Sequence, residues 1–417
     1  MKKITVLGLC LLGLGTLGAN AQLSLVKDAE RAAKSGATFA SVLEMVTPAF
    51  TNEETAKDAK AYYVPGLAAI KEYDQLLGLK SAGLLKEDDA RRMNSLLLEA
   101  NKYFQKALPL DSLPDAKGKI KPRVSKDIYN QLAGHLEDYI NAGVEEFNNN
   151  KNYAGAYDLW DVYVNLAQNP ELVKKYVDST GKPAPTNEYL GELIFNQAQA
   201  AMQQDKYQDM IDVLKKARAM GYTQKATFDY ALWAAQHLND TDQAFEIASE
   251  ALPLYGSEDS NYMANIINYY LVKEQNDKAF EIVNAALAEQ PDNDAYYVIQ
   301  GVLYEASNDN DKALETFKKA AEINPKNANA LYNYGRMLCN QAYAVSDAAP
   351  ADPKASEAYY NEKIKPLFLQ AVEVLENAYN VNLNDPNQPS NHDILKYLEN
   401  AYYNLHDEKM LEDVQNR

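Results

Sequence analysis

Residues Asp294–Asn327 read DAYYVIQGVLYEASNDNDKALETFKKAAEINPKN, and this block decides the fold. Its apolar and small residues form two runs in which members recur every three or four positions, the spacing of one face of a helix. Small residues at block positions 8, 20 and 27 allow the two predicted helices to approach closely. A proline at block position 32 ends the second helix. The pattern residues are Tyr297, Gln300, Gly301, Tyr304, Ala313, Phe317, Ala320 and Pro325.

The same offsets recur in the neighbouring blocks, and the strong copies start 34 residues apart. A helix pair of this size cannot bury its apolar stripe alone, so neighbouring pairs must stack into a continuous core. The sequence therefore predicts an all-α fold of repeated helix hairpins. In the block from Glu137, the first-helix offsets fall on Ile140, Gly143, Val144 and Phe147. The strong blocks start at Ser260, Asp294 and Ala328, and weaker copies start at Glu137, Gly191 and Lys225.

These residues resemble the tetratricopeptide repeat (TPR), in which an aromatic residue, a Leu-Gly pair and a Tyr precede Ala, Phe and Pro at the same offsets. In the block from Asp294 only Gln300 departs from the pattern, since the repeat usually has Leu there. The resemblance implies a right-handed superhelical TPR solenoid of about seven helix hairpins with irregular insertions. It also implies that a ligand binds on the concave face, through side chains of the first helix of each pair.

The pattern divides the chain into a leader, two irregular segments and a repeat array. Two insertions, Glu171–Leu190 and Val345–Lys354, are predicted to be surface loops, because they contain runs of Gly, Pro, Ala and Asp. The predicted segments are a signal peptide at 1–21, a leading helical segment at 22–57, a degenerate helix pair with a long connector at 58–136, and a TPR array at 137–417 with blocks near 137, 191, 225, 260, 294, 328 and 392.

The N-terminus has the features of a secretory signal peptide. Lys2 and Lys3 precede an apolar run that extends to about Leu17, and small residues follow up to Ala21. We expect cleavage after Ala21, and the apolar run is too short to span a membrane. The layout resembles exported TPR proteins of Gram-negative bacteria, so we expect a periplasmic or secreted protein without membrane insertion.

Net charge narrows the range of partners, and cysteine content limits disulfide bonding. The chain has 41 Lys and Arg against 59 Asp and Glu, a net charge of −18. Such a chain repels nucleic acid and anionic membrane surfaces, because both carry dense negative charge. After cleavage only Cys339 remains, so no intramolecular disulfide can form, and we expect this residue to be a buried apolar side chain.

No motif in the sequence points to catalysis, and we expect neither an enzyme nor a cofactor. The chain has no Gly-x-Ser-x-Gly elbow, no phosphate-binding glycine loop and no His-Glu-x-x-His helix. Asp309-Asn310-Asp311 resembles the start of a calcium loop, but the required Gly and Glu are missing further along. These residues lie where the turn between two predicted helices belongs, and we expect no metal site.

The resemblance places the partner-binding side chains on the first helix of each pair. Most are amides and aromatic or apolar residues, which can pair with a peptide backbone and cover its side chains. Few are cations, so a clamp for a C-terminal carboxylate is not expected. Tyr296 is also expected near this groove. The predicted partner-binding residues are Trp233, Gln236, Asn261, Asn268, Val298, Val302, Tyr332, Arg336 and Asn340.

These features predict a non-catalytic scaffold in the bacterial envelope that binds a protein or peptide through the concave face of the solenoid. The alternative is a glycan-binding accessory protein of envelope nutrient uptake, by analogy with helical-repeat starch-binding lipoproteins. Those lipoproteins have a lipid anchor, for which this chain offers no convincing sequence. The sequence does not identify the partner.

Overall fold

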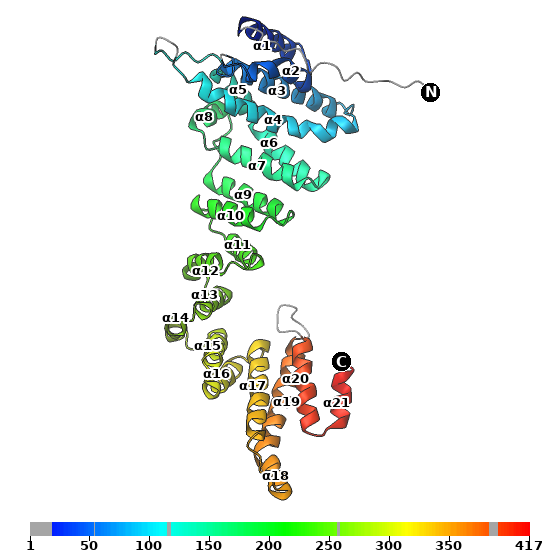
Figure 1. Ribbon diagram of the computed structural model, residues 1–417, viewed down its shortest axis with the longest axis vertical. Coiled ribbons are helices and arrows are strands. Elements are labelled where there is room, and N and C mark those ends of the chain that lie inside the picture. Colours follow the sequence, from blue (N-terminus) through cyan, green and yellow to red (C-terminus); the bar gives the residue numbers. More distant parts are fainter. Residues whose placement is uncertain (1–18, 54, 115–117, 257–258, 383–390) are drawn as a thin grey trace, which may run out of the picture. The chain divides into compact units, whose positions relative to one another are not determined.

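The computed structural model describes residues 19–53, 55–114, 118–256, 259–382 and 391–417. The regular secondary structure of these residues is helical, and they contain no β-strand. They divide into two compact units, one ending at Leu238 and the other spanning Asn239–Arg417. Figure 1 shows the helices of both. The predicted all-α fold of repeated helix hairpins is confirmed. Most of the predicted signal peptide, residues 1–18, lies outside the described residues.

Unit 1 contains the hairpins α1/α2, α3/α4, α6/α7 and α9/α10, each packed against its neighbours in the chain. Its last helix, α11, packs on α10. The helices of unit 1 are α1 Ala19–Lys34, α2 Phe39–Phe50, α3 Ala59–Ser81, α4 Glu87–Asp111, α5 Ser125–Gly134, α6 Leu136–Glu145, the π-helix η1 Glu146–Asn150, α7 Tyr153–Leu166, α8 Pro170–Thr180, α9 Asn187–Met202, α10 Tyr207–Ala219 and α11 Lys225–His237.

Unit 2 continues the repeat with the hairpins α13/α14, α15/α16, α17/α19 and α20/α21. A single apolar core runs from Tyr297 to Val414 through the last of these pairs. The helices of unit 2 are α12 Thr241–Tyr255, α13 Asn261–Val272, α14 Asn276–Glu289, α15 Asp294–Ala306, α16 Asn310–Ile323, α17 Ala328–Ser346, α18 Pro353–Tyr359, the π-helix η2 Tyr360–Ile364, α19 Lys365–Asn382, α20 Asn391–Asn404 and α21 Glu408–Gln415.

Close contact between the helices of a pair occurs at the small residue of block position 8, as the sequence predicts. A β-carbon added at Gly301 would lie 2.6 Å from the Phe317 ring, far inside van der Waals contact. The equivalent β-carbon at Gly335 would lie 2.5 Å from Leu375. The first helix therefore packs its bare backbone against a large side chain of the second.

In six blocks of the described residues, the turn between the first and second helix has a left-handed residue at block position 15. In the best repeat, Asn308 has φ of 59° and the next amide, that of Asp309, donates to the Tyr304 carbonyl at 2.9 Å. Asp309 then caps the second helix by accepting from the Lys312 amide. Recurrence of this geometry supports the register of the repeat. The left-handed residues are Lys151, Asp205, Asn239, Glu274, Asn308 and His406.

The first helix of the block near Glu137 begins one residue earlier than the offsets predict. Val144, expected to pack, is 44% exposed, whereas Gly143 is buried and lies against Trp160. The π-helix η1 explains the slip, because a π-helical turn accommodates one extra residue before the second helix. The buried Glu146 carboxylate holds this turn by accepting hydrogen bonds from the amides of Asn94, Asn150 and Asn152, at 2.8, 2.9 and 2.8 Å.

The insertion Glu171–Leu190 is not the surface loop that was expected. Its first half forms α8, which Asn169 caps by accepting from two backbone amides, and Leu172 and Tyr176 are buried. This helix packs on α5, and only residues 181–186 separate it from α9. The other insertion, Val345–Lys354, contains the expected break, since α17 ends at Ser346 and α18 begins at Pro353.

Substituting Gly301 with Ala tests the close helix contact. We expect Gly301→Ala to lower the free energy of unfolding by about 1–3 kcal/mol, because the new methyl group overlaps the Phe317 ring. The matched control is Gly78→Ala in α3, where no atom lies within 4 Å of the added carbon and about 0.5–1 kcal/mol of stabilisation is expected. Urea unfolding followed by circular dichroism measures both, and equal stability of the two variants would contradict the packing.

Cys339 is fully buried, as the sequence predicts, and burial raises the pKa of its thiol to about 12. The other cysteine of the full sequence, Cys10, is replaced by Ser so that Cys339 alone can react. Because the thiolate is the reactive form, we expect this variant, when folded, to react with Ellman's reagent near pH 8 at least about a hundredfold more slowly than when unfolded. Absorbance of the released thionitrobenzoate measures the rate. Similar rates in the folded and unfolded chain would show that the side chain is accessible.

Candidate functional site

The first helices of the unit 2 hairpins lie next to one another, since α15 contacts both α13 and α17. Most of the predicted partner-binding residues occur on these helices at spacings of four or seven residues, which place them on one side of each helix. We call this surface the first-helix face. Its residues are Asn261 and Asn268 on α13, Val298 and Val302 on α15, and Tyr332, Arg336 and Asn340 on α17.

A groove of about 850 Å³ lies at one end of the first-helix face. Asn261 of α13, Val298 of α15 and Asn329 of α17 all line it, so side chains of successive repeats meet at one site. On its α16–α17 side, the amides of Asn324 and Asn327 donate to Asp294 at 3.1 and 2.5 Å. The groove therefore has an amide-rich lining, and these hydrogen bonds hold the turn between α16 and α17 beside it.

Arg336 does not offer a free charge to a partner. Its guanidinium donates to both Glu305 oxygens at 2.7 and 2.6 Å and to Asn333 at 3.0 Å, and its side chain is 16% exposed. Hydrogen bonds from Arg336 hold the pKa of Glu305 below its ordinary value. The pair joins α15 to α17, and the sequence analysis missed it because the two residues are 31 positions apart.

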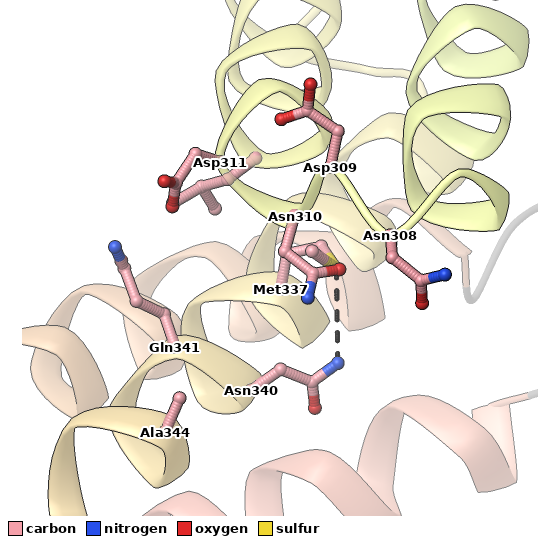
Figure 2. Close-up of a pocket in the computed structure, with 9 residues that line it drawn as sticks. Asn308, Asp309, Asn310, Asp311, Met337, Asn340, Gln341 and Ala344 are labelled. Atoms are coloured by element: carbon pink, nitrogen blue, oxygen red, sulfur yellow. Dashed lines mark hydrogen bonds between the residues drawn. The ribbon is translucent and has the colours of Figure 1, made fainter. Parts of the chain in front are cut away.

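Asn340 lies in a pocket of about 390 Å³ between the α15–α16 turn and α17 (Figure 2). Figure 2 shows Asn308–Asp311 on one wall, and Asn340, Gln341 and Ala344 on the other. The Asn340 amide lies 3.9 Å from the Met337 sulfur. Asp309 bonds Lys312 at 2.6 Å, and no cluster that could hold a metal ion occurs among the described residues. Amide and carboxylate oxygens on these walls suit hydrogen-bond donors.

Val302, Tyr332 and Tyr296, which belong to α15 and α17, differ in how deeply they are buried. Val302 is 39% exposed, and Tyr332 is half-buried with its ring edge-on to Tyr397 at 6.0 Å. The expectation that Tyr296 faces the groove is wrong. Tyr296 is 3% exposed, and its hydroxyl donates to the Gly256 carbonyl at 3.0 Å, because this position packs between neighbouring hairpins.

The predicted residues Trp233 and Gln236 lie on α11, which belongs to unit 1, so they are not part of the first-helix face of unit 2. Trp233 is 36% exposed and forms an aromatic cluster with Tyr207 and His237, at ring distances of 5.4 and 3.9 Å. Tyr207 could not be predicted from first-helix offsets, because it starts α10, the second helix of the preceding repeat.

Among the described residues, no helix combines the length and the apolar run that a membrane span requires. The predicted partner-binding role of the nine residues stays a prediction. The structure brings the unit 2 members together on adjacent helices, and it shows that Arg336 is neutralised by Glu305.

Comparisons with known proteins identify the repeat. The sequence model of the family described as Tetratricopeptide repeat matches residues 316–342, which run from α16 into α17. This match confirms that the chain carries the repeat its sequence predicts. No curated protein matches the chain.

Solved structures with similar folds share little sequence with this chain. A TPR repeats protein from Bacteroides fragilis is 17% identical over 65% of this chain and 98% of its own, with a TM-score of 0.32. MamA protein is 20% identical over 47% of this chain and 95% of its own, with a TM-score of 0.31. YrrB, described as a TPR protein with an unusual peptide-binding site, is 16% identical over 51% and 93%, with a TM-score of 0.28.

The Arg336–Glu305 pair predicts a specific pH dependence of stability. Because the folded pKa of Glu305 is lowered, its stabilisation is complete above the unfolded value of about 4.5 and is lost as pH falls through the folded pKa. We expect Arg336→Met to lower the free energy of unfolding by about 1–3 kcal/mol near pH 7, and the deficit to shrink toward about pH 3. Urea unfolding at several pH values measures this.

The matched control is Lys318→Met on α16. The Lys318 side chain is 53% exposed, and its ammonium group lies 3.8 Å from a Glu322 oxygen, a looser contact than that between Arg336 and Glu305. Loss of that pair should change the free energy of unfolding little at any pH, since exposed ion pairs contribute about 0–1 kcal/mol. A deficit for Arg336→Met that stays constant with pH would show that lost packing, not the ion pair, is responsible.

Proposed function

We propose that this tetratricopeptide-repeat chain is a non-catalytic scaffold that binds an extended segment of another protein along the first-helix face of unit 2. One observation carries the proposal, namely the groove of about 850 Å³ in which Asn261, Val298 and Asn329 from three successive repeats meet. A surface formed by equivalent positions of consecutive repeats suits an elongated ligand, because each repeat can contact the next part of it.

The chemistry of the face favours a peptide over a charged ligand. Amides such as Asn261, Asn268 and Asn340 can both donate to and accept from a peptide backbone, while Val302 offers apolar contact. Arg336 is already paired with Glu305, so a terminal carboxylate finds no free cation there. The net charge of −18 makes nucleic acid and strongly acidic segments poor partners.

We also propose that the protein acts in the bacterial envelope. Lys2 and Lys3, the apolar run after them and the small residues before Gln22 support export through a cleaved signal peptide. The partner should then be an envelope protein, so an envelope extract is the material in which to crosslink it.

The alternative, a glycan-binding accessory protein, is favoured by one separate feature. Trp233, Tyr207 and His237 form a partly exposed aromatic cluster in unit 1. Aromatic faces of this kind can cover the apolar face of a sugar ring. Trp233→Ala should abolish binding on a glycan array if this alternative holds, and should leave peptide capture by unit 2 unchanged if the scaffold proposal holds.

Site-specific photo-crosslinking tests the scaffold proposal. We expect Val302→p-benzoylphenylalanine and Asn268→p-benzoylphenylalanine to form adducts with the same envelope protein, because both positions are exposed on the first-helix face. The matched control is the same replacement at Lys318, which is exposed on α16, the second helix of its hairpin. Mass spectrometry of the adducts identifies the crosslinked segment.

A synthetic peptide of that segment then provides the affinity measurement. Val302→Glu should weaken its binding about tenfold, because a buried carboxylate replaces an apolar contact. Adducts that form equally at Lys318, or an affinity that Val302→Glu does not change, would place the binding surface elsewhere on the chain.

A further inference from the structure

Unit 1 contains a second pocket, which α8 and the segment 181–186 build and which has no part in the first-helix face. Its volume is about 430 Å³. Side chains from α6, α7, α8 and α9 line it, and the strap Lys182–Thr186 closes one side. The pocket therefore depends on residues that are an insertion between two repeats.

Three tyrosines form the aromatic part of this pocket. Tyr163 and Tyr176 are buried and supply its floor, whereas Tyr189 is 42% exposed at its rim. The Tyr163 and Tyr189 rings are nearly perpendicular, at 83°, with centroids 6.4 Å apart. The two rings therefore form an aromatic corner in the pocket lining, and the faces of aromatic rings attract cations.

A carboxylate lies beside the tyrosines. Glu137 accepts a hydrogen bond from the Tyr176 hydroxyl at 2.6 Å, and Lys182 of the strap contacts both of its oxygens at 2.6 Å. Hydrogen bonds from Lys182 and Tyr176 keep the pKa of Glu137 below its ordinary value, so the group stays charged. The side chains of Lys182 and Glu137 remain 54% and 45% exposed, respectively.

We propose that this pocket binds a Lys or Arg side chain of a partner protein, and that Lys182 of the chain itself occupies the carboxylate until the partner displaces it. Lys182 shows that an ammonium group can reach the Glu137 carboxylate from the lining of the pocket. An exposed ion pair contributes little to stability, so its displacement costs little. The net charge of −18 attracts a cationic partner and disfavours an anionic one.

The strap is suited to such an exchange. Gly181 has φ of 70°, which ends α8, and the two prolines at 183 and 185 keep the following segment out of a helix. Lys182 can therefore leave Glu137 by rotation of its own side chain, without unfolding of α8 or α9. Arg has an advantage over Lys as the guest, because its planar guanidinium can bond both carboxylate oxygens at once.

Titration with a model peptide tests the proposal, using Ac-Gly-Pro-Arg-Pro-Gly-amide and the same peptide with citrulline, a neutral near-isostere of Arg. Shifts of the backbone amide signals of Gly181 and Ala184 in NMR spectra of the full-length chain report binding at the strap. We expect the Arg peptide to bind and the citrulline peptide to bind at least tenfold more weakly. Lys182→Ala should tighten binding of the Arg peptide severalfold, since it removes the internal competitor.

Glu137→Gln should weaken binding of the Arg peptide at least tenfold. In the wild-type chain, raising the salt concentration should also weaken binding of this peptide. Lys80→Ala is the matched control for Lys182→Ala, because Lys80 bonds Glu145 at 2.6–2.7 Å in the same unit and both variants remove one positive charge. It should leave the affinity within twofold of wild type. Circular dichroism melting confirms that each variant is folded.

Several results would overturn the proposal. Equal affinity for the Arg and citrulline peptides, or unchanged binding in folded Glu137→Gln, would mean that the pocket takes a neutral guest. Binding that Lys182→Ala leaves unchanged or weakens would mean that Lys182 is a structural clasp. The scaffold proposal for unit 2 is independent of these outcomes, because no residue of the first-helix face is altered.

Discussion

The fold depends on a complementarity of side-chain size across each hairpin, between block position 8 of the first helix and position 24 of the second. Gly301 faces Phe317 and Gly335 faces Leu375, and neither glycine leaves room for a β-carbon. Where position 8 is larger, position 24 is smaller, as with Ile267 and Val283. Because interiors are close-packed, the sum of the two volumes is constrained more tightly than either residue. This constraint brings the helices of each pair together and repeats along the chain.

Packing of this kind leaves one side of the first helices free for other roles. The second helices and the left-handed turns, such as that at Asn308, supply much of the packing within the hairpins, to which Val298 and Tyr332 of the first-helix face also contribute. Side chains on this face differ in role: Asn268 is exposed, whereas Arg336 joins α15 to α17 through Glu305. A position that the repeat pattern assigns to ligand contact can therefore serve stability instead, so register alone does not establish a binding residue.

The architecture was predictable because it rests on local, repeated spacing, and the errors arose where one residue or one partner breaks that spacing. The π-helix η1 inserts a residue inside a first helix, which shifted Gly143 and Val144 by one position without any change in the apolar pattern after it. The glycine and prolines at 181–185 led to the prediction of a loop where α8 lies, although Asn169-Pro170 is a favourable helix start. The Arg336–Glu305 pair and the buried hydroxyl of Tyr296 depend on contacts between repeats, which spacing within one repeat cannot show.

The two surfaces proposed here arise in different ways from the same repeat. On the first-helix face, equivalent positions of successive repeats are placed in a row, so its shape is dictated by the helix pairs and only the side chains can be chosen. At the unit 1 pocket, the inserted residues 170–186 add a helix and a strap, which bring Tyr176 and Lys182 to Glu137 of an ordinary repeat helix. A regular solenoid has few enclosed sites, because each hairpin contacts only its neighbours. An insertion that folds back onto the array is therefore a direct way for it to acquire a pocket with a defined charge.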